Sequence, residues 1–325
     1  GIYYLYATND GSNGYIAYTS TDLVNWHAEG YVLRKSDVQL NNANSYAGLW
    51  APEVMREGDT YYMVYTAQGH IGIATAESPL GPFKDKSGRL FTVHQNRRWD
   101  EDYLMTCQAV QSGAIGNITT IQSRVYGQRG VCFGWRADPV AGGGMLYDWG
   151  IHLIDQLLCM FRGHEVVSVY ARLLSILTPA VDDSFELQLE FDHSVVGKIQ
   201  VGTFCLQELP RWFVYGDRGT LKIDDFSGKT GGMARIRQNV HGFDSVFGKH
   251  LGPSRTMAPL KPEFVEQLPL PQVSTDPLAY HRNLVHACAG LDVPCVSFTD
   301  MRRDMKVVDL AFESSRTRQV LAVRV

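Results

Sequence analysis

Two ionisable residues, Asp148 and His152, stand four positions apart in an apolar run of helical length. Side chains at this spacing on an α-helix lie on one face, about one turn apart. An imidazole with a carboxylate beside it can take the proton of a hydroxyl group while hydride leaves the attached carbon. The pair is therefore a candidate acid–base site. The alternative interpretation is a core histidine near a helix-capping aspartate.

A run of glycines, residues 142–144, directly precedes this candidate helix. Glycine at a helix N-terminus would let a ligand approach the backbone closely. The run is not a dinucleotide-binding turn, because no strand–turn–helix pattern surrounds it. Asp155 faces differently from Asp148 on a helix, so we expect Asp155 to be structural.

The elements that must position these residues follow residue 92. A run of strands with helices before and after it predicts an α+β domain, with a predominantly antiparallel sheet and flanking helices. Residues 226–262 are rich in glycine, proline and basic residues and indicate a surface excursion. Thr299 is the expected N-cap of the last helix. Strands are predicted at 118–126, 166–174, 184–191, 195–204, 212–215 and 219–224, and helices at 99–112, 145–161, 277–289 and 299–317.

Residues 1–91 have a different pattern. Short alternating runs rich in tyrosine, with turns about every 8–12 residues, predict an all-β segment. Residues 3–20 resemble residues 61–76 at an offset of about 57 residues, a period typical of propeller blades. The sequence therefore predicts two domains, 1–91 and 92–325. The first corresponds to a partial propeller of about two blades.

Four segments of the first domain match one family in order. They are Tyr-Tyr-Leu-Tyr at 3–6, Ser-Thr-Asp-Leu-Val-Asn-Trp at 20–26, Leu-Trp-Ala-Pro-Glu-Val at 49–54, and the segment 73–83. They resemble the family 43 glycoside hydrolases, which are five-bladed propellers. Glycoside hydrolysis needs two carboxyl groups beside the scissile bond. The family's catalytic carboxylates lie outside the matching part, and we expect Glu53 to be structural or substrate-side. An incomplete ring of blades should be unstable alone.

The second domain carries a longer set of matching phrases, at residues 95–100, 134–139, 142–155, 215–221 and 280–317. They resemble the C-terminal part of the Gfo/Idh/MocA oxidoreductases, the family of glucose-fructose oxidoreductase and inositol dehydrogenase.

This resemblance assigns substrate binding and proton transfer to His152 and Asp148. It places Asn96, Trp135 and Arg136 near the substrate or the nicotinamide. It further implies a sugar or polyol substrate, and a homo-oligomer formed through the sheet.

The resemblance also implies NAD(P), which such enzymes hold on a Rossmann unit. The Gly-x-Gly-x-x-Gly motif of that unit appears nowhere in the chain, and the hydrolase pattern stands where the family's Glu-Lys-Pro phrase should precede Gln95. The cofactor-binding residues are therefore unknown. We expect a truncated oxidoreductase, impaired in catalysis and fused to a hydrolase fragment. A natural fusion of bacterial carbohydrate genes and an assembly artefact both explain the junction.

Two other functions stay open: a glycosidase-like protein acting on arabinose- or xylose-containing glycans, and a non-catalytic carbohydrate-binding protein. The net charge of −4 provides no basic field for nucleic acid. No apolar run is long enough to cross a membrane. The six cysteines lack metal-binding spacing. We expect no metal, and buried thiols in a cytoplasmic protein.

Overall fold

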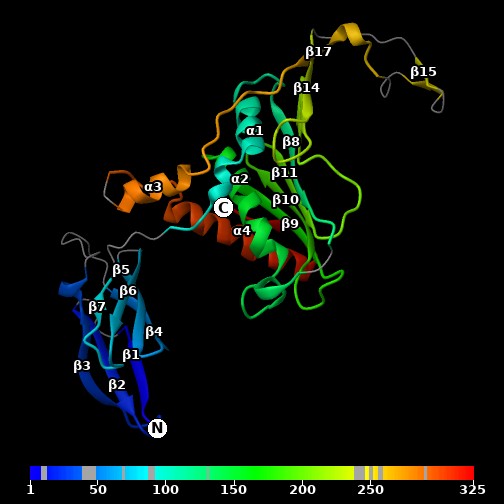
Figure 1. The fold of residues 1–325 in the computed structure, drawn as a ribbon. Helices are drawn as coiled ribbons and strands as arrows, with labels where there is room; N and C mark the ends of the chain where they lie inside the picture. The colour runs from blue at the N-terminus through cyan, green and yellow to red at the C-terminus, as the bar shows by residue number, and fades with distance from the viewer. Residues whose placement is uncertain are drawn as a thin grey trace. The chain divides into compact units, whose positions relative to one another are not determined.

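The computed structural model describes residues 1–8, 13–38, 49–67, 70–86, 92–129, 132–237, 246–248, 252–254, 259–288 and 291–325. The chain forms two compact units, Gly1–Phe91 and Thr92–Val325, here called the smaller and the larger unit (Figure 1). No helix in the described ranges is long and apolar enough to cross a bilayer.

The smaller unit contains two antiparallel sheets that share one core. The buried Tyr15 links them, because its hydroxyl donates to the carbonyl of Trp50 at 3.0 Å and its ring contacts that of Tyr65. The described residues of this unit form two sheets but no closed ring, so the propeller stays a prediction. The strands are β1 (Tyr3–Ala7), β2 (Gly14–Ser20) and β3 (His27–Arg34) in one sheet, and β4 (Leu49–Glu57), β5 (Thr60–Ala67), β6 (His70–Ala76) and β7 (Lys84–Asp85) in the other.

The larger unit is built on a nine-stranded sheet, in the order β17-β14-β13-β12-β8-β11-β10-β9-β18. Among its described strands, β8 and β11 pair in parallel and the other neighbours are antiparallel. The strands are β8 (Ile118–Tyr126), β9 (Val166–Leu174), β10 (Ser184–Phe191), β11 (Val196–Gly202), β12 (Trp212–Gly216), β13 (Gly219–Ile223), β14 (Gly231–Ile236), β17 (Val265–Leu268) and β18 (Leu321–Ala322).

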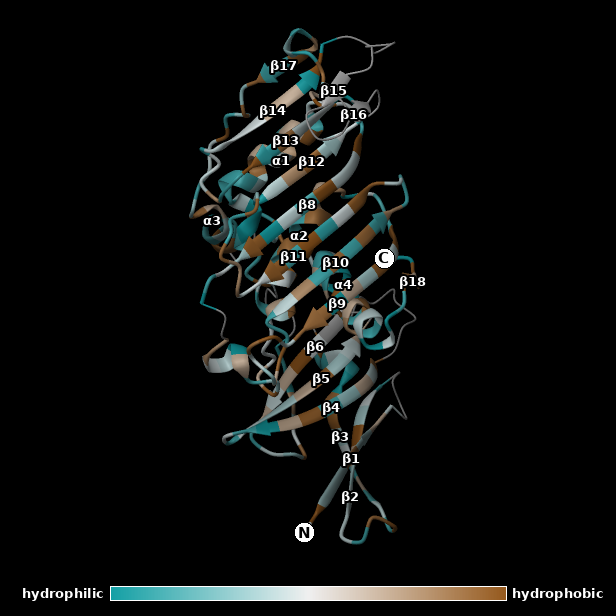
Figure 2. Ribbon diagram, turned by 90° about the vertical axis from the view of Figure 1, so that its right-hand side faces the viewer, coloured by the Kyte–Doolittle hydropathy of each residue, from teal (hydrophilic) through white to brown (hydrophobic). Residues whose placement is uncertain are grey.

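Helices α1 (Glu101–Gln111), α2 (Ile151–Met160) and α4 (Phe298–Thr317) cover one face of this sheet, and Figure 2 looks onto the other face. The sequence of strand β10 reflects this one-sided cover. Its side chains alternate between buried and exposed, as a strand with one buried face requires. Phe185 and Leu187 face the helices, whereas Glu186 lies on the open face. The predicted α+β class with a largely antiparallel sheet is confirmed.

Three expectations about local structure need correction. Ser297, not Thr299, is the N-cap of α4. Its hydroxyl accepts a hydrogen bond from the backbone amide of Asp300, as part of a capping box. The segment 226–262 contributes β14, which pairs with β13, although much of the excursion lies outside the described residues. Of the five cysteines whose burial is described, Cys132 is buried and the other four are partly exposed; all five are free.

The other described elements are the 3₁₀ turns Lys35–Asp37, Asn96–Trp99, Gly134–Ala137 and Pro262–Phe264, the π-helical turn Leu146–Gly150, helix α3 (Ala279–Cys288), and the hairpin of β15 (Val246–Gly248) and β16 (Gly252–Ser254).

Candidate active site

Asp148 lies in the π-helical turn Leu146–Gly150, immediately before α2. A π-turn closes hydrogen bonds over five residues instead of the four of an α-helix. Asp148 and His152 have different hydrogen-bond partners, Arg136 and Gln95. That the two side chains share one helical face stays a prediction. The Asp148 charge still acts on His152, whose pKa it raises against larger opposing effects.

Arg136 holds the carboxylate of Asp148. Its Nε lies 2.6 Å from Asp148 Oδ2, and its guanidinium lies 4.5 Å from the centre of the Trp135 ring. Asp148 is 16% exposed and Arg136 is 40% exposed, so solvent or a ligand can reach this pair. The carboxylate oxygens of this ion pair can also accept hydrogen bonds from hydroxyl groups.

The glycine run brings these two residues together. A Cβ at Gly143 would lie 2.6 Å from the carbonyl oxygen of Arg136, so only glycine allows this approach. The amides of Gly143 and Gly144 donate to the carbonyls of Asp138 and Arg136, at 2.8 and 3.0 Å. Gly143 and Gly144 thus contact the backbone of residues 135–138, whereas the space beside Gly142 is open.

Asp182 anchors the same turn from the sheet side. Its Oδ2 accepts the amide of Leu146 at 2.8 Å, and its carboxylate occupies the place where a Cβ of Gly144 would stand. Burial raises the pKa of Asp182 to about 6, against the lowering effect of these backbone donors. The conformation of the turn that contains Asp148 is therefore coupled to whether Asp182 is protonated.

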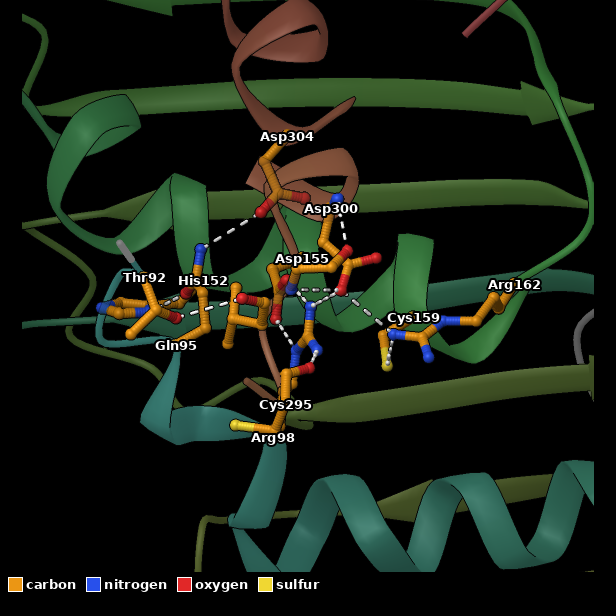
Figure 3. Close-up of polar contacts among 12 residues, drawn as sticks. Thr92, Gln95, Arg98, His152, Asp155, Cys159, Arg162, Cys295, Asp300 and Asp304 are labelled. Atoms are coloured by element: carbon orange, nitrogen blue, oxygen red, sulfur yellow. Dashed lines mark hydrogen bonds and ion pairs between the residues drawn. The ribbon is translucent and has the colours of Figure 1, made fainter. Parts of the chain in front are cut away.

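His152, on α2, is partly buried and belongs to a separate polar network (Figure 3). Its Nδ1 lies 2.6 Å from Gln95 Oε1, and Gln95 Nε2 donates to Asp304 Oδ2 at 3.3 Å. Burial lowers the pKa of His152, and the nearby Arg97 cation lowers it further. The imidazole is therefore neutral at pH 7, which is the form that can accept a proton.

The network ends in a buried ion pair. Arg98 donates from Nε and Nη2 to both oxygens of Asp155, at 2.8 and 2.6 Å, and from Nη1 to the carbonyl of Cys295 at 2.6 Å. Arg98 and Asp155 are 8% and 2% exposed. Burial raises the pKa of Asp304 well above its ordinary value, and the adjacent Asp155 carboxylate adds to this effect.

Two cavities flank the Asp148 turn. The first has a volume of about 650 Å³ and is lined by Arg136, Asp148 and the ends of β8 and β11. The second has a volume of about 470 Å³ and contains Asn96. Trp149 and Phe226 line both cavities.

The Arg97 guanidinium lies 3.9 Å from the centre of the Trp149 ring, at the boundary between the cavities. The structure thus places Arg136 and Asp148 together and Asn96 in the neighbouring cavity. Trp135 is 47% exposed beside Arg136, and His152 lines neither cavity.

The sequence did not single out three residues that shape this site, namely Gln95, Asp182 and Asp304. Gln95 belonged to the matching phrase at 95–100, which was a usable signal. Asp304 also lay in a matching phrase, at 280–317, but the sequence could not pair it with a glutamine 209 positions away.

The described residues also include one group of potential metal ligands elsewhere: His164, Asp192 and His193. Both imidazole Nδ1 atoms contact the same carboxylate oxygen, at 2.8 and 3.3 Å. Simple hydrogen bonds account for this arrangement. In the smaller unit, Glu53 is exposed on β4.

Comparison with known proteins assigns different families to the two units. Residues 103–222 match the GFO/IDH/MocA C-terminal domain, and residues 1–105 match the glycosyl hydrolases family 43. Both resemblances are thereby confirmed.

Two curated relatives illustrate this. The scyllo-inositol 2-dehydrogenase (NADP(+)) of Bacillus subtilis is 26% identical over 76% of this chain and 69% of its own length. The arabinoxylan arabinofuranohydrolase of Paenibacillus polymyxa is 34% identical over 23% of this chain and 13% of its own length.

Solved structures add the fold of the larger unit. An NAD-binding protein from Listeria innocua is 32% identical with a TM-score of 0.68, covering 73% of this chain and 68% of that one. An aldose-aldose oxidoreductase from Caulobacter crescentus, complexed with glycerol, is 19% identical with a TM-score of 0.54, covering 73% and 65%. This chain thus spans about two thirds of the length of these structures.

Proposed function

The chain belongs to the GFO/IDH/MocA oxidoreductase family through its larger unit, and from this premise we propose that the unit binds a sugar or polyol for oxidation. The observation that carries the proposal is the Arg136–Asp148 pair at the edge of the 650 Å³ cavity. A partly exposed ion pair in a cavity with aromatic walls suits a ligand that has many hydroxyl groups and apolar C–H faces. The names of the inositol dehydrogenase and the aldose-aldose oxidoreductase support this substrate class.

The proposed roles follow from the contacts of each residue. Asp148 accepts hydrogen bonds from substrate hydroxyl groups, and Arg136 donates to its carboxylate and holds it in place. His152, neutral because of burial, receives the hydroxyl proton. Asn96 and Trp135 contact the substrate or the nicotinamide, as the family resemblance implies. His152 lines neither cavity, so the proposal requires the substrate to extend from the cavity past Asp148.

Hydride removal from a sugar carbon requires NAD(P), which a Rossmann unit would supply. Within the described parts of the chain, parallel strand pairing is confined to β8 and β11, and no glycine motif follows a strand in a βαβ unit. These residues do not fit a dinucleotide, so we derive no step through it. We infer that the 325 residues provide only the substrate side, fused to a hydrolase-like segment and impaired in catalysis alone.

Calorimetry on the full chain tests substrate binding with inositols, aldoses and glycerol. We expect a sugar or polyol to bind, and Asp148→Asn or Arg136→Met to weaken binding about 10- to 100-fold, because each removes a charged hydrogen-bond partner. Asp309→Asn, at an exposed position on α4, is the matched control and should leave binding unchanged. Equal binding in all variants would refute the assignment of the cavity.

Three outcomes distinguish the alternatives. A nicotinamide dissociation constant in the micromolar range, or sugar oxidation by the chain alone, would contradict the inferred lack of a cofactor site. Arylarabinoside hydrolysis that is lost in Glu53→Gln would support the glycosidase alternative. Sedimentation analysis tests the proposed homo-oligomer, which would use the open face of the nine-stranded sheet.

A further inference from the structure

A continuous series of polar contacts joins His152 to the buried ion pair through residues from three elements. His152 and Asp155 lie on α2 and Asp304 lies on α4, as Figure 3 shows. Gln95 precedes the 3₁₀ turn Asn96–Trp99, and Arg98 lies within it. Gln95 and Asp304 are 3% and 2% exposed, so water does not replace their partners. Each donor and acceptor in this series must therefore match its neighbour.

The orientation of the Gln95 amide determines which nitrogen of His152 carries the proton. Asp304 Oδ2 is an acceptor for the amide nitrogen of Gln95, so Gln95 must present Nε2 to Asp304 and Oε1 to His152. A carbonyl oxygen only accepts, so the facing Nδ1 of His152 must donate. In a neutral imidazole this leaves Nε2 unprotonated.

Asp304 is suited to this task in its neutral form. Arg98 donates to both oxygens of Asp155 and so pairs its cation with that carboxylate. Two adjacent buried carboxylates do not both ionise, so Asp304 retains a proton. Its hydroxyl can then donate to Asp155 while its carbonyl oxygen accepts from Gln95, which satisfies both neighbours at once.

We propose that Gln95 and Asp304 are positioning residues, which hold the proton of neutral His152 on Nδ1 and leave Nε2 as the atom that receives the substrate proton. The assignment of the proton acceptor rests on the proposed function. The assignment of the tautomer does not, because it follows from hydrogen bonding within the free protein.

Nitrogen-15 NMR of the full, ligand-free chain measures the tautomer directly. We expect the His152 ring nitrogens of the unmodified protein to give two well-separated signals, with the proton on Nδ1. The loss of one pair of signals in His152→Asn assigns them among the ten histidines. Because no ligand is present, failure of the sugar-binding test leaves this measurement unaffected.

Variants then test the two positioning residues. Gln95→Met removes the acceptor and should move the two ring signals toward each other as the tautomers mix. Gln111→Met, at the exposed end of α1, is the matched control and should leave them unchanged. Asp304→Asn preserves a neutral donor–acceptor pair and should retain the Nδ1 tautomer, whereas Asp304→Leu should not.

Two results would overturn the proposal. One is a proton on Nε2 in the unmodified protein, which no folding defect in a variant can explain. The other is an unchanged spectrum in Gln95→Met. Loss of the Nδ1 tautomer in correctly folded Asp304→Asn, judged by its backbone amide spectrum, would overturn the role of a neutral Asp304.

Discussion

The two units differ in what their interiors contain. Among the buried polar and charged side chains of the described residues, Ser20 belongs to the smaller unit and all the others to the larger unit. The larger unit buries the Arg98–Asp155 pair together with Gln95 and Asp304, whereas the sheets of the smaller unit are joined by the neutral Tyr15 hydroxyl.

Burying charge is costly and does not by itself favour folding. The larger unit nevertheless contains these charges, and they lie around the candidate catalytic histidine. We infer that they are retained to position His152, not to increase stability.

The surface of the smaller unit is informative as well. In the smaller unit, large apolar side chains on strands are exposed: Tyr3 by 46%, Leu5 by 43% and Trp50 by 65%. Exposed apolar side chains of this size usually mark surfaces that pack against something else. Neighbouring blades would supply such a partner, which agrees with the prediction of an incomplete propeller.

The strongest test of the comparison is Arg98→Met. It leaves Asp155 buried without its cation, so we expect the free energy of unfolding of the larger unit to fall by about 3–5 kcal/mol. Hydrogen exchange of the α2 amides reports this loss, and the β5 amides of the smaller unit should be unaffected. Arg302→Met, at an exposed position on α4, is the control. A change below about 1 kcal/mol would show that the buried pair is dispensable.

The next effect concerns Asp182, whose folded-state pKa of about 6 lies above its ordinary value of 3.8. A raised carboxyl pKa contributes stability below the unfolded pKa, and this contribution is lost as the pH rises through 6. Relative to Asp182→Asn, the unmodified larger unit should therefore gain up to about 3 kcal/mol between pH 7 and pH 4. Urea unfolding at several pH values measures this difference.

Asp309→Asn provides the comparison for Asp182→Asn and should show no such pH-dependent difference. If the free energy of unfolding of Asp182→Asn has the same pH dependence as that of the unmodified protein, the carboxyl of Asp182 does not titrate as described.

The smallest effect is expected in the smaller unit. Tyr15→Phe removes the hydroxyl that donates to the carbonyl of Trp50, and should lower the stability of that unit by about 1 kcal/mol. Hydrogen exchange of the β5 amides measures it, with Tyr3→Phe at a half-exposed position as the control. A loss as large as that in Arg98→Met would contradict the contrast between neutral and charged interiors.

Local pattern determined much of what the sequence could predict. The alternation of apolar and polar residues predicted the observed bounds of β8, β9 and β10. A strand with one buried face has this pattern because successive side chains point to opposite faces of the sheet. The matching phrases identified Arg136 and Asp148, which the structure brings together. They also distinguished two parts of the chain, which match different families.

Tertiary structure decided how the site is arranged. Asp148 lies in a π-turn, and Gly150 at the end of that turn packs against Phe185, which is distant in sequence. Asp304 reached Gln95 only because α4 folds back over α2. Residue types and their short spacings are local properties that the sequence determines. The partner and proton of a buried side chain depend on neighbours distant in sequence, which only the folded chain brings together.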